Sequence, residues 1–175
     1  PDLKTETLLN YLRSFLILYP WLLEELKIDF SRRITPFVDP FPQKYVINIL
    51  EPSYAPDQEQ LISDYMEFNP TRNRPLDMMP IFAWVNKELI YPVMEDKKNV
   101  PRPTFHYRLP NSRIDDPVWR FEDEWNLWLE IEKLAGDNEM LHKLSRLYVT
   151  RKEETVISFR KEWATTVAIL LDLDE

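Results

Sequence analysis

Residues 69–80 read Asn69-Pro70-Thr71-Arg72-Asn73-Arg74-Pro75-Leu76-Asp77-Met78-Met79-Pro80 and set two arginines among three prolines. Proline removes a backbone donor and favours extended geometry in the residue before it, so this stretch predicts a stiff connector between two helices. Arg72 and Arg74 are two residues apart, which places both side chains on one side of an extended segment. Paired guanidinium groups suit phosphate or carboxylate oxygens, although surface arginines paired with acidic side chains would leave the same pattern.

The composition predicts one globular domain spanning residues 1–175. Hydrophobic residues make up 44% of the chain, and the net charge of -8 argues against a protein that mainly binds nucleic acid nonspecifically. One glycine against fifteen prolines excludes a glycine-rich phosphate loop, so bound phosphate would have to be held by side chains. The absence of cysteine excludes disulfides and thiolate zinc sites and is compatible with the cytoplasm, where we expect the protein to lie.

The longest apolar run, residues 8–23, is interrupted by polar residues and by Pro20. It is shorter than the roughly 20 apolar residues that span a bilayer, so we expect a core helix and no membrane contact. The chain passes almost directly from Pro1 into this helix. We therefore expect an upstream part of the protein, which makes this domain the C-terminal part of a larger one.

Apolar residues at steps of three and four predict a helix over residues 5–27, which Pro20 should kink or divide. Residues 45–50 are short, rich in β-branched side chains and bounded by prolines, which predicts a strand. Asp57, with Gln60 three residues later, has the spacing of a capping box at a helix start.

Asp77 has the position of an N-cap for a helix that reaches about Ile90. Asp116 followed by a proline predicts the start of another helix, which ends at Gly136, and two more helices are expected over 138–150 and 153–172. The helix ending at Gly136 carries three tryptophans. Helical spacing favours packing in the core over a ligand cage, and we expect Trp125 to be a core residue. The tryptophans in question are Trp119, Trp125 and Trp128.

Residues 104–109 alternate strictly between two kinds of side chain and predict a strand with one polar face. His106 and Arg108 share that face. A histidine in this setting could be a metal ligand, a general acid or base, or a hydrogen-bonding residue of the sheet. Because helical stripes dominate and strands are few, we expect an α+β fold with helices packed on one face of a small antiparallel sheet.

Several phrases of the sequence resemble a known family. They are similar to the later part of the bacterial amidoligases, relatives of glutamine synthetase and glutamate-cysteine ligase, and the similarity spans residues 5–150. The phrases are Asp29-Phe30-Ser31-Arg32-Arg33, Pro40-Phe41-Pro42-Gln43-Lys44-Tyr45, Asn69-Pro70-Thr71-Arg72-Asn73-Arg74 followed by Leu76-Asp77-Met78, and Phe105-His106-Tyr107-Arg108-Leu109-Pro110-Asn111.

The resemblance implies an ATP-dependent carboxylate-amine ligase on a glutamine-synthetase-like scaffold, incomplete in this chain, that forms an amide or isopeptide bond. It implies ATP and Mg²⁺ as cofactors and small-molecule or peptide carboxylates and amines as substrates. The catalytic residues implied are Arg72, Arg74 and Arg108, which would neutralise a transferring phosphoryl group. The candidates for cofactor binding are Arg32, Arg33, Asn69 and Asn73.

One departure from the family pattern affects the metal site. The corresponding strand usually reads Glu-x-Arg with the glutamate on metal, whereas here His106 precedes Tyr107 and Arg108. Either His106 takes the place of that ligand, or the strand supplies only the arginine. The family also has earlier strands whose acidic residues hold metal, and this chain has no counterpart of them. Another chain or an upstream segment would therefore complete the site. The rival hypothesis is a non-enzymatic protein-protein interaction module of a larger assembly.

Overall fold

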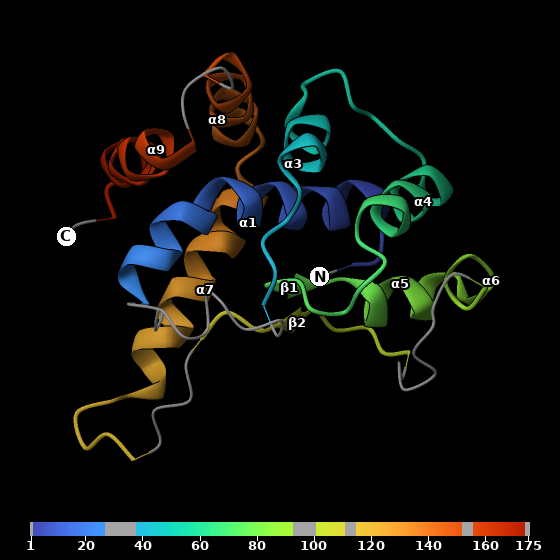
Figure 1. Ribbon diagram of the computed structural model, residues 1–175, viewed down its shortest axis with the longest axis horizontal. Coiled ribbons are helices and arrows are strands. Elements are labelled where there is room, and N and C mark those ends of the chain that lie inside the picture. The colour runs from blue at the N-terminus through green and yellow to red at the C-terminus, as the bar shows by residue number, and fades with distance from the viewer. Residues whose placement is uncertain (1, 27–37, 93–100, 111–114, 152–155, 174–175) are drawn as a thin grey trace.

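The computed structural model describes residues 2–26, 38–92, 101–110, 115–151 and 156–173 (Figure 1). These residues form eight helices and two short strands. In chain order the elements are α1 (Thr5–Glu25), α3 (Gln43–Leu50), α4 (Gln58–Phe68), β1 (Leu76–Asp77), α5 (Met79–Val85), α6 (Lys87–Ile90), β2 (His106–Tyr107), α7 (Phe121–Gly136), α8 (Asn138–Thr150) and α9 (Val156–Leu171).

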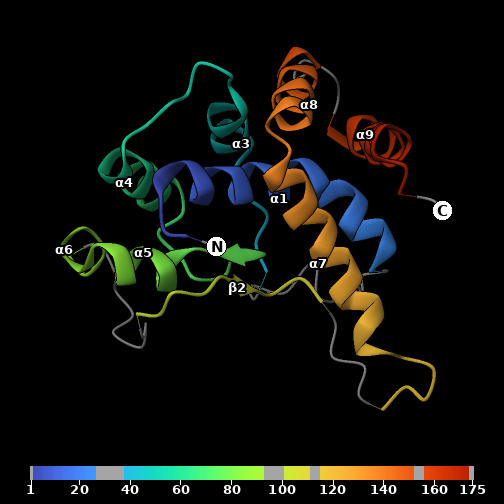
Figure 2. The same ribbon diagram turned by 180° about the vertical axis from the view of Figure 1, so that it is seen from behind.

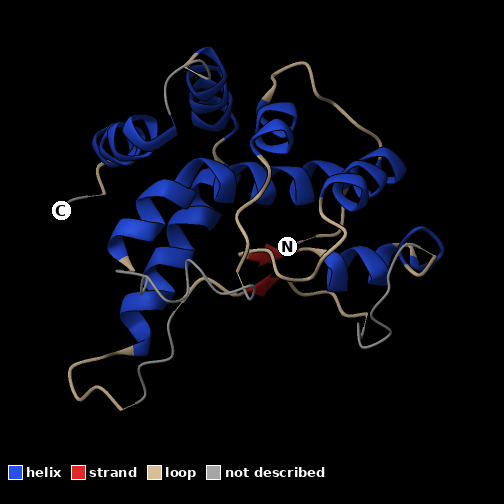
Figure 3. Ribbon diagram, viewed as in Figure 1, coloured by secondary structure: helices blue, strands red, loops and turns tan. Residues whose placement is uncertain are grey.

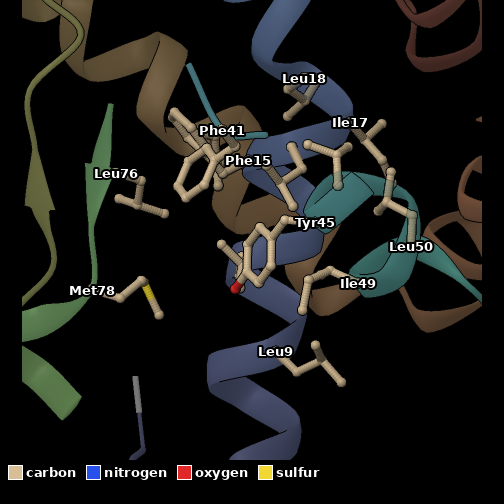
Figure 4. Close-up of a cluster of buried hydrophobic side chains, with 14 of the residues drawn as sticks. Leu9, Phe15, Ile17, Leu18, Phe41, Tyr45, Ile49, Leu50, Leu76 and Met78 are labelled. Atoms are coloured by element: carbon tan, nitrogen blue, oxygen red, sulfur yellow. The ribbon is translucent and has the colours of Figure 1, made fainter. Parts of the chain in front are cut away.

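The first helix, α1, is the element on which the others pack. In both ribbon views it lies between α3 and α8 on one side and the two strands on the other (Figures 1 and 2). It forms one element through Pro20, so of the two alternatives expected at Pro20, a kink or a division, the division does not occur. Its apolar stripe enters a continuous core with side chains of α3 and β1, including Tyr45, Ile49 and Leu76 (Figure 4).

The expected strand over residues 45–50 is a helix, α3. Its buried residues fall at steps of one, three and one, which fits one face of a helix. Arg13 of α1 forms hydrogen bonds at the carboxyl end of α3. The Arg13 guanidinium donates to the carbonyl oxygens of Ile49 at 2.7 Å, Glu51 at 3.1 Å and Tyr54 at 2.8 Å. A buried arginine that satisfies free carbonyls of a helix end stabilises the helix against the β preference of its residues.

Two predicted helix starts have different outcomes. Asp57 caps α4 as expected, since its side chain accepts from the backbone nitrogen of Gln60 at 2.8 Å. The Gln60 side chain turns to Asp64 instead of returning to the cap, so the capping box is half formed. Asp77 is not the N-cap it was expected to be, because it lies in β1 and Met78 precedes α5. The expected helix from Asp77 to Ile90 is two helices, because Asn86 ends α5 and caps α6.

The helix after Asp116 begins later than expected, at Phe121. Asp116 instead closes a turn, in which its side chain accepts from the Val118 backbone nitrogen at 3.1 Å. In the first turns of α7 Phe121 is 60% and Trp125 is 50% exposed, so the expectation that Trp125 is a core residue is wrong. Trp128, one turn later, does pack on the core, against Tyr11, Phe105 and Tyr107.

The described chain is mostly helical, with one antiparallel pair of two-residue strands (Figure 3). The small antiparallel sheet is thus confirmed, but two residues in each strand are too few to form a layer on which helices pack. The helix expected over 138–150 has those bounds in α8, and the last helix begins at Val156. None of the described helices combines the length and hydropathy needed to cross a bilayer.

Candidate functional site

The antiparallel pair β1–β2 positions the polar residues of the candidate site. Leu76 pairs with Tyr107 and Asp77 with His106, and the Arg108 backbone nitrogen extends the pair by donating to the Pro75 carbonyl at 2.8 Å. Side chains alternate across a strand, so the aromatic side of β2 turns to the core and its polar side turns to Asp77. His106 and Arg108 share that polar side, as the alternation predicts.

Asp77 lies at the centre of what we call the Asp77 cluster, with Arg72, His106 and Arg108 around it. Its Oδ2 is 3.4 Å from Arg72 Nε, 3.4 Å from Arg108 Nη2 and 3.4 Å from His106 Nδ1. Its Oδ1 accepts from the Met79 backbone nitrogen at 3.1 Å. These side-chain distances exceed the 2.7–2.9 Å typical of charge-assisted hydrogen bonds, so the contacts of Asp77 with the three side chains are long.

The cluster is open to solvent on its cationic side. The Asp77 side chain is fully buried, whereas those of Arg72, Arg108 and His106 are 19%, 23% and 35% exposed. Burial, and then repulsion by Arg108, hold the pKa of His106 below its usual 6.5, against the opposing attraction of Asp77. His106 is therefore mainly neutral at pH 7, and two permanent guanidinium charges face one carboxylate.

Arg74 does not join this cluster. Its Nη1 donates to the Pro40 carbonyl at 2.6 Å and the Asp39 carbonyl at 3.4 Å, and its Nη2 donates to the Phe68 carbonyl at 3.4 Å. The guanidinium is buried, which lowers its pKa. The expected common side for Arg72 and Arg74 requires a regular extended segment, whereas the chain bends at residues 71–72 and 74–75. Between these bends the Asn73 carbonyl accepts from the Asp39 backbone nitrogen at 2.6 Å.

The four expected cofactor-binding residues are placed unequally. Asn69 is fully buried and donates to the Tyr65 carbonyl at 3.0 Å, while its Oδ1 has no partner in the described part of the chain. Asn73 is partly exposed, and its backbone nitrogen donates to the Thr71 hydroxyl at 3.1 Å. Arg32 and Arg33 lie outside the described residues. A nucleotide-binding role for these four residues stays a prediction.

Comparison with known protein families assigns the chain to one of them. Residues 1–130 match the family described as "Putative amidoligase enzyme". The chain belongs to this amidoligase family. The match covers the first part of the chain and not its later part, so the similarity expected over residues 131–150 is not supported. Neither the curated proteins nor the solved structures gave a match.

The segment matched to the amidoligase family contains the whole Asp77 cluster and one supporting residue that the sequence did not indicate. Tyr65 of α4 donates from its hydroxyl to the Leu76 carbonyl at 3.3 Å and accepts from the Met78 backbone nitrogen at 3.1 Å. Both contacts flank Asp77, so Tyr65 fixes the strand that carries the carboxylate. Burial, and then the Asp77 charge, raise the pKa of Tyr65, which keeps its hydroxyl protonated.

The described residues do not fit the expected Mg²⁺ site at His106. Mg²⁺ prefers several oxygen ligands in octahedral geometry. In the described ranges no three histidine, aspartate or glutamate side chains gather as metal ligands. The carboxylate nearest to His106 is that of Asp77, which already faces two guanidinium groups. We therefore derive no step of the chemistry through a metal at this position.

Proposed function

We propose that this member of the amidoligase family is an ATP-dependent carboxylate-amine ligase and that Arg72 and Arg108 bind anionic oxygens at its reaction centre. In the reaction that the resemblance implies, a phosphoryl group passes to the substrate carboxylate, and an amine then displaces phosphate to leave an amide. Both steps develop negative charge on oxygen. The proposal assigns these two arginines to that charge.

The observation that carries the proposal is the meeting of Arg72 and Arg108 on one carboxylate oxygen. They come from separate segments, and each nitrogen lies 3.4 Å from Asp77 Oδ2. The Asp77 carboxylate holds both guanidinium groups on one side of the strand pair. Within the described residues, Arg72 makes this one polar contact, so its terminal nitrogens remain available to an anion.

In this proposal Asp77 is a positioning residue and His106 reports on the site. An anion bound beside Arg72 and Arg108 would offset the repulsion that lowers the pKa of His106. Phosphate binding should therefore raise that pKa. Arg74 was expected to act with the other two, but its contacts favour a structural role for it, and a catalytic one stays a prediction.

The first test measures inorganic phosphate binding to the natural protein through the imidazole signals of His106. Arg72→Lys and Arg108→Lys keep the charge but lose the fork, so each should weaken phosphate binding and lower ATP turnover by roughly 10²- to 10³-fold. Arg120→Lys is the matched control, because Arg120 is exposed and pairs with Asp123 on the surface. The proposed roles are wrong if both site variants bind phosphate and turn over ATP as the natural protein does.

A further inference from the structure

The amino-terminal end of α7 carries apolar side chains that the fold leaves exposed. Phe121 is 60% and Trp125 is 50% exposed, and Val118 in the preceding turn is more exposed than either. The Phe121 and Trp125 rings stack on each other, with centroids 5.9 Å apart. We call these three residues the α7 aromatic surface. In both ribbon views this end of α7 projects from the rest of the molecule (Figures 1 and 2).

The turn before α7 is held in place, so the α7 aromatic surface is an ordered feature of the fold. Trp119 Nε1 donates to Glu124 Oε1 at 3.0 Å, and Arg120 Nη2 donates to Asp123 Oδ1 at 2.9 Å. Both contacts tie the turn to the first turn of the helix. Exposed aromatic residues on a fixed support cost little conformational entropy when a partner covers them.

The described residues next to this surface along the chain carry mostly negative charge. Residues 115–125 contain five carboxylates and one guanidinium, which already pairs with Asp123. Carboxylates in a first helical turn are favoured by the helix dipole, which accounts for Glu122 and its neighbours. The helix dipole acts on charges and does not explain why two large aromatic rings face water. Exposed apolar patches of this kind mark interaction sites.

We propose that the α7 aromatic surface binds a polypeptide segment in which apolar side chains are flanked by lysine or arginine. The rings of Phe121 and Trp125 would be the apolar anchor, and the surrounding carboxylates would select a basic segment and disfavour an acidic one. The site is separate from the Asp77 cluster, so this inference does not depend on the proposed ligase activity. It gives the interaction hypothesis a specific surface and a partner of stated chemistry.

The test selects a random peptide library on the natural protein and then measures the affinity of the enriched peptides. Enriched peptides should combine leucine or aromatic residues with lysine or arginine, and Trp125→Ala should weaken their binding by roughly tenfold or more. Glu122→Lys should weaken binding as well and reduce its dependence on salt. Trp84→Ala is the matched control, because Trp84 is 52% exposed on α5. In both ribbon views the two strands lie between α5 and α7 (Figures 1 and 2).

Several results would overturn the proposal. They are the absence of any enrichment, enrichment of acidic peptides, and equal losses for Trp84→Ala and Trp125→Ala. Self-association of the protein that Trp125→Ala abolishes would show instead that a second copy covers the surface. Circular dichroism and the free energy of unfolding of each variant separate a lost contact from a lost fold.

Discussion

Asp77 decides how the arginines of this chain are used. A fully buried carboxylate needs partners, and Asp77 takes them from two guanidinium groups and the Met79 backbone nitrogen. Arg72 and Arg108 therefore remain at the surface side of the carboxylate, whereas Arg74 is used inside the fold on three carbonyl oxygens. Three arginines that look equivalent in sequence thus have two different environments.

The lowered pKa of His106 predicts a pH dependence of stability. The folded protein disfavours the protonated ring, so as pH falls below 6.5 the unfolded chain takes up a proton that the folded chain resists. The contribution is present above the ordinary pKa of histidine and is lost as pH falls through the lower, folded value. The free energy of unfolding should fall more between about pH 7.5 and 5.5 in the natural protein than in His106→Gln.

Denaturant titrations at the two pH values measure the free energy of unfolding of both proteins. Subtracting the change in His106→Gln from the change in the natural protein removes the contributions of the other groups. A direct NMR titration of the His106 ring gives the folded pKa itself. Equal slopes in the two proteins, or a folded pKa at or above 6.5, would contradict the assigned environment.

The sequence predicts part of the Asp77 cluster for a clear reason. Strand alternation depends only on local geometry, so residues 104–109 correctly place His106 and Arg108 on one side. The relation between Arg72 and Arg74 depends on residues 39 and 40, about 35 positions away, whose carbonyls take the Arg74 guanidinium. Asp77 has the sequence position of a helix cap, and only the pairing of the strands reveals it as the centre.

At the scale of elements, tertiary contacts explain where the expectations fail. α3 contains the β-branched residues Val46, Ile47 and Ile49, yet it is a helix, and Arg13 of α1 donates to the Ile49 carbonyl at its carboxyl end. In α7 the apolar spacing is helical, as expected, but periodicity does not say how far the neighbouring helix extends. The first turns of α7 project from the molecule, and there the same stripe faces solvent.

Trp125→Ala tests this reading of α7. Because half of the side chain is exposed and its ring stacks on the exposed Phe121, the change should lower the free energy of unfolding by less than about 1 kcal/mol. A buried aromatic would cost about 3–5 kcal/mol. Denaturant unfolding distinguishes the two values, and a loss in the higher range would place Trp125 in a core contact that the fold does not show.

At the scale of the whole molecule, the amidoligase family match and the packed core have different limits. The match ends at residue 130, inside α7, whereas the core continues through α8 and α9. Both of these helices contact α1, the first helix of the matched segment. The carboxyl-terminal helices are therefore structural partners of the matched segment, and the single domain expected from composition stays a prediction.

Trp163 of α9 gives the sharpest test of this continuity. Its side chain is fully buried, and its Nε1 donates to the Ile17 carbonyl of α1 at 2.8 Å across 146 residues of sequence. Tyr148 of α8 meets its ring edge-on, with centroids 4.9 Å apart, so one side chain joins three helices. Trp163→Ala removes a buried aromatic and a buried donor, and should lower the free energy of unfolding by about 3–5 kcal/mol.

Trp125→Ala, measured in the same denaturant series, is the matched control, because Trp125 lies inside the family match but outside the core. If Trp163→Ala costs as little as Trp125→Ala, α9 is an appendage and the core ends with the matched segment. A large loss within a single cooperative transition would instead mean that α1 and α9 unfold together as parts of one domain.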